Sequence, residues 1–162
     1  MKRLFFISLF VLCMSAAAIA VPDKKAALDA IAVIETSHDG EALGNAIRVV
    51  INFAQDSPDV LLLVSKEATP WILEELKLTK DQNEVVGSML LASYAAGSIK
   101  HQLTLGKTDE NPYEGWLLAL KSYEHLKLKI DFTSPGMEKL LKLQSEGKLK
   151  AYGEKLLKEK KW

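Results

Sequence analysis

The sequence has almost no cysteine and little histidine. Cys13 is the single cysteine in 162 residues, so no disulfide can form within the chain, and cysteine-based zinc or redox motifs are excluded. The three histidines, His38, His101 and His125, are not spaced as metal ligands, and H-E-x-x-H does not occur. The fold must therefore be stabilised by packing, and we predict no cofactor and no metal.

Familiar catalytic and phosphate-binding motifs are also missing. The chain contains no G-x-S-x-G elbow for a catalytic serine, no glycine-rich phosphate loop and no dinucleotide fingerprint. Ser88, Ser93 and Ser98 fall within one helical pattern, where serines typically pack or bond to the backbone. The sequence therefore does not predict an enzyme.

Neither sign of charge dominates, since 21 Lys and Arg residues match 21 Asp and Glu residues. A balanced total argues against nucleic-acid binding, which requires a concentrated basic surface. The charge is nevertheless uneven: residues 35–84 carry ten acids and four bases, and residues 137–162 carry eight lysines and four glutamates. These segments are solvated helix faces, the interpretation we favour, or they form a dipolar surface that orients a partner.

A long apolar run occurs only at the N-terminus. Two basic residues precede the apolar stretch 4–14, which is too short and wrongly flanked for a transmembrane span. Ala18 and Ala20 fit the small-x-small rule for cleavage between Ala20 and Val21. We predict that residues 1–20 are a cleaved secretory signal peptide, and that the mature protein is periplasmic or secreted.

The longest helical pattern runs from Thr79 to Gly106. Thr79 suits a helix N-cap, Gln82 completes a capping box, and Gly106 suits the left-handed residue that follows a helix. Small residues around Tyr94 make Gly97 a point where another helix can cross closely. Apolar residues recur between these ends at helical spacing, namely Val85, Met89, Ala92, Ala96, Ile99 and Leu103. The pattern predicts a buried central helix.

Shorter helical patterns flank this central helix. They cover residues 23–37 and 39–54, a short segment after Thr69-Pro70, residues 111–129, and a basic C-terminal helix after Ser134-Pro135 in which Gly147 and Gly153 allow a break. Residues 58–68 hold five consecutive apolar residues, which suit a buried strand or a buried helix, and the leading proline favours a helix.

The fold class follows from these helices. No linker divides the chain, and the helix-starting prolines show no repeat period. We therefore predict that residues 21–162 form a single all-α domain, a multi-helix bundle of about six to seven helices built from stacked helical hairpins without disulfides.

One group of polar and aromatic residues lies where the two central helices join. An antiparallel return brings His101 towards Glu114 or Asp109, and a His–carboxylate pair can move protons, hold a metal or form a surface hydrogen bond. Tyr113 and Trp116 suit the edge of the core or, if exposed, the anchoring of a partner. The predicted partner- or ligand-binding residues are Tyr94, Lys100, His101, Asn111, Tyr113, Glu114 and Trp116.

These observations favour a protein that acts by binding. The leading hypothesis is an adaptor, inhibitor or immunity-type module for another exported or envelope protein. The alternative is a carrier of a small apolar ligand or lipid, since the Ala, Gly and Ser face of the central helix could leave a cavity. A third hypothesis is a hydrolase or metal enzyme centred on His101. The basic C-terminal helix also has the composition of a membrane-surface element, although a packed terminal helix is favoured.

Overall fold

The computed structural model describes residues 23–37, 40–108 and 111–159, so the predicted signal peptide and its cleavage site lie outside the described residues. Within the described ranges the chain is all-helical and has no strand, which confirms the predicted fold class. No helix in this part of the chain is both long enough and apolar enough to cross a membrane. The elements are α1 (Lys24–Thr36), α2 (Gly40–Asp56), the 3-10 helix η1 (Pro70–Leu73), α3 (Lys80–Leu105), α4 (Tyr113–Lys127), α5 (Pro135–Ser145) and α6 (Leu149–Glu159).

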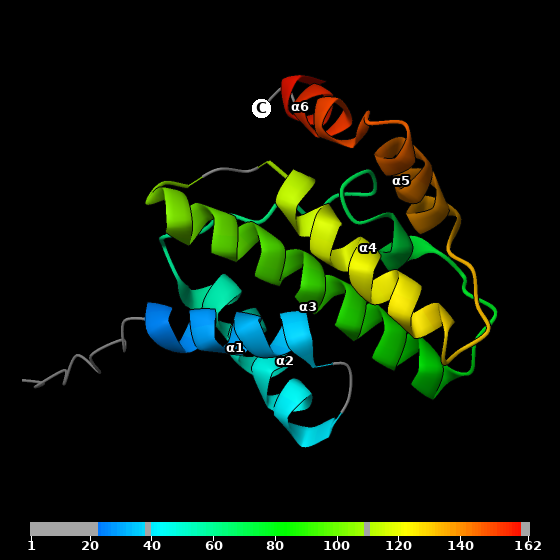
Figure 1. Cartoon of the computed structure of the whole chain (residues 1–162), viewed down its shortest axis with the longest axis horizontal. Coiled ribbons are helices and arrows are strands. Elements are labelled where there is room, and N and C mark those ends of the chain that lie inside the picture. The colour runs from blue at the N-terminus through cyan, green and yellow to red at the C-terminus, as the bar shows by residue number, and fades with distance from the viewer. Residues whose placement is uncertain (1–22, 38–39, 109–110, 160–162) are drawn as a thin grey trace, which may run out of the picture.

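The helices are arranged around a central hairpin. α3 and α4 run antiparallel and pack along their length, the α1–α2 hairpin covers one side of this pair, and η1, α5 and α6 lie on the other side (Figure 1). The α1–α2 hairpin therefore packs mainly on α3, whereas α5 and α6 pack on α4, and the core is shared among all the elements.

Both predicted ends of the central helix are confirmed. The Thr79 hydroxyl accepts from the Gln82 amide at 3.3 Å, and the Gln82 side chain accepts in return from the Thr79 amide at 3.1 Å. Gly106 ends the helix with φ +65°. The middle of α3 is buried on every side, whereas Val85 near its beginning is 58% exposed and Val86 is buried in its place.

Two glycines set the close approach of α3 and α4. A Cβ atom on Gly97 would lie 2.9 Å from the carbonyl carbon of Glu114 and 3.1 Å from the Cα of Gly115. A Cβ atom on Gly115 would lie 2.6 Å from the ring of Tyr94. The helices therefore cross at this pair because neither residue has a side chain, as the sequence indicated for Gly97.

The prediction of a helix over 58–68 is wrong. These residues are neither helix nor strand but an irregular segment with turns at both ends, which we call the strap (57–69). Gln102 of α3 accepts from the Leu61 amide at 2.9 Å and donates to the Leu61 carbonyl at 2.9 Å. A side chain thus supplies the hydrogen bonds that a helix or a neighbouring strand would otherwise provide.

Two aromatic side chains complete the attachment of the strap. The Tyr94 hydroxyl donates to the Leu63 carbonyl at 2.7 Å, and the Trp116 indole N–H donates to the Ala68 carbonyl at 2.7 Å. Apolar residues of the strap also enter the core, including Leu63, which is only 3% exposed. The five apolar residues of this segment are therefore divided between core and surface, which a continuous buried helix would not allow.

The C-terminal region is two helices rather than one. α5 ends at Ser145, Gly147 has φ +68°, and α6 begins at Leu149, so the break falls at the first of the two predicted glycines. α5 is held to α4 by Glu138, whose carboxylate accepts from the Tyr123 hydroxyl at 2.7 Å and lies 2.5 Å from the Lys127 ammonium.

Candidate functional site

The seven residues predicted from sequence do not form one surface. Tyr94 is 1% exposed and Trp116 is fully buried, and the polar atom of each donates to the strap as described above. Trp116 also stacks on Tyr152 of α6, with ring centroids 5.5 Å apart. Both aromatics hold the core together, so a partner on the molecular surface would not contact them.

Asn111 and Tyr113 act locally at the beginning of α4. The Asn111 side-chain oxygen accepts from the Tyr113 amide at 3.1 Å, which satisfies one backbone donor of the first helical turn. Both residues are half-buried, and neither lines the cleft described next.

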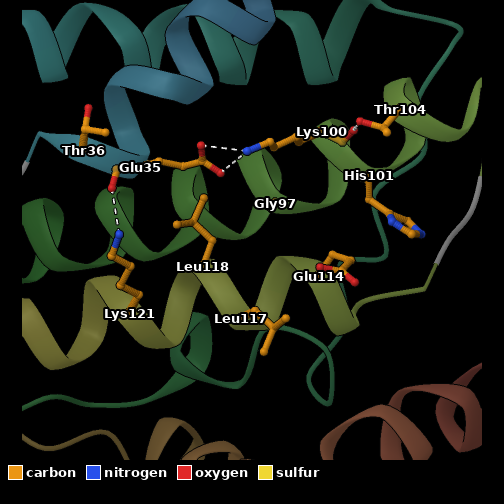
Figure 2. Close-up of a pocket in the computed structure, with 10 residues that line it drawn as sticks. All are labelled: Glu35, Thr36, Gly97, Lys100, His101, Thr104, Glu114, Leu117, Leu118 and Lys121. Atoms are coloured by element: carbon orange, nitrogen blue, oxygen red, sulfur yellow. Dashed lines mark hydrogen bonds and ion pairs between the residues drawn. The ribbon is translucent and has the colours of Figure 1, made fainter.

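The other three predicted residues, Lys100, His101 and Glu114, line a polar cleft between the end of α1, the second half of α3 and α4 (Figure 2). The cleft has a volume of about 570 Å³ and is also lined by Glu35 and Lys121. The antiparallel return of α4 thus brings His101 and Glu114 to the same depression. Asp109, the other predicted neighbour of His101, lies outside the described residues.

The charged groups of this cleft attach α1 to the central hairpin. The Lys100 ammonium lies 2.6 and 2.8 Å from the two carboxylate oxygens of Glu35, and the Lys121 ammonium donates to the Glu35 carbonyl at 2.9 Å (Figure 2). α1 has no basic residue in its own last turn, so Lys121 supplies the positive charge that a helix C-terminus favours. Both lysines therefore stabilise the packing of α1 on α3 and α4.

The described residues do not assemble a metal site around His101. Among them, no three His, Cys, Asp or Glu side chains are grouped in a way that could hold a metal ion. The polar cleft is lined by one imidazole, two carboxylates and two lysines.

A second depression, which we call the α2–α3 groove, is more apolar. It has a volume of about 610 Å³ and lies between the beginnings of α2 and α3 and the end of α4. Its lining residues are Gly40, Leu43, Gly44, Ile47, Asp81, Glu84, Val85, Ser88, Met89, Leu126, Lys129 and Ile130.

The lining follows helical spacing on two walls. α2 contributes positions 40, 43, 44 and 47, and α3 contributes 81, 84, 85 and 88, each set being i, i+3, i+4 and i+7 on a single helix face. Leu43, Met89 and Leu126 are at most 7% exposed and form the floor. Val85, at 58% exposed, stands on the α3 wall with its apolar surface open to solvent.

Two of the α2 residues that line the groove are glycines, so they add no side chain to this wall. A Cβ atom on Gly40 or Gly44 would have no neighbouring atom within 4 Å, and Gly44 is exposed in the interior of a helix. A glycine in a helix interior costs about 1 kcal/mol relative to alanine, and here no close packing requires it. The absence of a side chain at Gly44 instead leaves the groove open.

Sequence reasoning missed this groove. It assigned Val85 to the buried face of the central helix because Val85 recurs at helical spacing with buried residues. Periodicity identifies the apolar face of a helix but not which part of that face the rest of the chain covers. The available signal was Gly40 and Gly44 on the same stripe as the apolar residues of α2.

Comparison of the chain with known protein families, with curated proteins and with solved structures found no match. The function must therefore be argued from the two depressions themselves.

Proposed function

We propose that the protein is an exported helical module that binds another exported or envelope protein, and that it takes a helix of that partner into the α2–α3 groove. The groove itself carries the proposal. It presents an apolar floor, two walls with helical spacing and an exposed Val85, which together suit the helix-in-groove mode of recognition. Export rests on the predicted signal peptide.

A helical partner fits this groove better than a carried lipid does. A lipid cavity would need space beside the Ala, Gly and Ser part of α3, but this part is buried and closely packed against α4 at Gly97. Carriers usually enclose most of an apolar ligand. The α2–α3 groove is instead an open surface feature with charged side chains along its edge.

The proposal is tested by cross-linking in the cell envelope. A photo-reactive amino acid is placed at Val85 in the full chain, expressed in its own host, and at Leu73 of η1 as a control, since Leu73 is 71% exposed and does not line the groove. We expect one defined protein adduct from position 85 and not from position 73.

Matched glycine variants show whether that adduct depends on the groove. Gly44→Leu fills the groove, whereas Gly87→Leu makes the same change in α3 outside the groove lining, at another glycine whose Cβ would meet nothing within 4 Å. Loss of the adduct with Gly44→Leu alone supports the proposal. Equal capture from positions 85 and 73, or an adduct that Gly44→Leu leaves unchanged, overturns it.

A further inference from the structure

The length of the groove limits what it can hold. The groove-facing residues of α2 extend from Gly40 to Ile47, and those of α3 from Asp81 to Met89. At 1.5 Å per residue these walls are about 10 to 12 Å long, which corresponds to roughly two turns of helix. A helix seated there can place two or three apolar side chains on the floor, at i, i+3 or i+4, and i+7.

Carboxylates lie along the α3 wall. Asp81 and Glu84 both line the groove and are exposed, and Glu41 lies in the exposed first turn of α2. Lys80 is 4.0 Å from Glu84, but these side chains are 87% and 69% exposed, and such a pair contributes little. Lys129 adds one positive charge on the α4 side. The groove is therefore apolar on its floor and acidic along the α3 wall.

We propose that the occupant is an amphipathic helical segment of the partner protein, with about two turns of apolar anchors flanked on one side by lysine or arginine. This inference rests on the proposed function, because it names the chemistry of the helix bound in the same groove. The apolar anchors cover Val85 and the floor, and the basic residues lie along Asp81 and Glu84. The charges fix the orientation of the helix, and the apolar contact supplies most of the affinity.

Other occupants fit the charges and the packing less well. A fatty acid or an anionic lipid would bring its own negative charge to the carboxylates of the α3 wall. A second copy could offer its lysine-rich α6, but Leu149, Tyr152 and Leu156 of that helix already pack against the core of their own chain. Leu149 is 2% exposed, and Tyr152 stacks on Trp116.

Two designed peptides test the charge requirement. Both are helix-stabilised, about four turns long and identical in their leucine anchors, and they carry either lysines or glutamates beside the anchors. Binding of each to the full chain is measured by titration calorimetry at low salt. We expect the basic peptide to bind more tightly than the acidic one, by up to about fivefold for each carboxylate of the α3 wall that its lysines contact.

Variants of the protein separate the inference from the proposed function. Replacing Asp81 and Glu84 together by lysine should reverse the preference between the peptides, and Gly44→Leu should abolish binding of both. The proposal of a basic partner is contradicted if the two peptides bind the unaltered chain with equal affinity. It is also contradicted if the double lysine variant leaves the ratio of the two affinities unchanged. The proposed function still stands in that case if Gly44→Leu removes binding.

The remaining outcomes also decide the matter. Displacement of the basic peptide by a long-chain fatty acid at comparable affinity would assign the groove to a lipid. A mass that doubles with protein concentration, in a manner sensitive to Gly44→Leu, would assign it to a second copy. Failure of both peptides to bind overturns the inference, and absence of an adduct at position 85 overturns the proposed function.

Discussion

The side-chain amide of Gln102 holds the backbone of Leu61 by two hydrogen bonds, each 2.9 Å long. Gln102 is 1% exposed, and its amide N–H also donates to the Ser98 carbonyl at 3.3 Å. The strap, an apolar segment without regular structure, is thereby fixed to α3 with its backbone groups at Leu61 satisfied. Gln102 acts here as a short substitute for a neighbouring strand.

Gln102→Ala is expected to lower the free energy of unfolding by about 1–3 kcal/mol, because it leaves the polar backbone groups of Leu61 without their partner. Urea denaturation measures the loss, and amide hydrogen exchange should become faster at Leu61 in particular. The exposed Gln144 provides a control, since Gln144→Ala should change stability by less than about 0.5 kcal/mol. Equal effects of the two variants would show that the strap does not depend on Gln102.

Gly97→Ala is expected to destabilise the protein by about 1–3 kcal/mol, because its Cβ atom would meet the backbone of Glu114, which cannot rotate away. The matched variant is Gly87→Ala in the same helix, where a Cβ atom meets nothing within 4 Å. That change should stabilise the protein by about 0.5–1 kcal/mol through helix propensity. Thermal unfolding of both variants should therefore give shifts of opposite sign.

Acid should weaken the attachment of α5 to α4. The hydrogen bond from Lys127, followed by that from Tyr123, lowers the pKa of Glu138 below its ordinary value of 4.5. A carboxylate with a lowered pKa in the folded state stabilises the fold at neutral pH, and this contribution is lost as the pH falls below 4.5 and through the folded-state pKa. Stability should therefore decline at low pH, and Glu138→Gln should flatten that decline.

The size of this pH effect is limited by solvent. The Glu138 and Lys127 side chains are 39% and 36% exposed, so screening keeps the contribution of the pair modest. Denaturant midpoints measured from pH 3 to pH 7 for Glu138→Gln and for the exposed control Glu124→Gln provide the comparison. If the denaturant midpoint falls equally steeply at low pH in both variants, Glu138 is not the cause of the decline.

The sequence predicted the fold best where the signal was local. The capping box at Thr79, the left-handed Gly106 and the break at Gly147 each depend on a few neighbouring residues, and all are present. The strap was mispredicted because its conformation depends on Gln102, which is 41 residues away from Leu61. Local propensity contains no information about such a partner.

The candidate site was harder to predict for a related reason. Tyr94 and Trp116 have the composition of binding residues, but contacts with distant strap carbonyls place them in the core. Conversely, Val85 has the spacing of a core residue but is 58% exposed and lines a groove. Which apolar face stays uncovered is decided by how the α1–α2 hairpin sits on α3, and periodicity does not report that arrangement.

Gly44 distinguishes stability from function. Gly44→Ala should raise the free energy of unfolding by about 0.5–1 kcal/mol, because the residue is exposed within α2 and nothing lies within 4 Å of its Cβ position. Gly44→Leu should be at least as stable as the unaltered chain, yet its side chain occupies the groove. Thermal unfolding checks the first expectation, and a melting temperature lowered in both variants would contradict it.

The most direct test of the binding function is native mass spectrometry of the protein released gently from its own cell envelope, with Gly44→Leu and Gly87→Leu examined in parallel. We predict a second protein chain at fixed stoichiometry on the unaltered protein and on Gly87→Leu, and its loss from a fully folded Gly44→Leu. A partner that remains on Gly44→Leu, or a protein that carries no second chain, would contradict the proposal that the α2–α3 groove is the site of function.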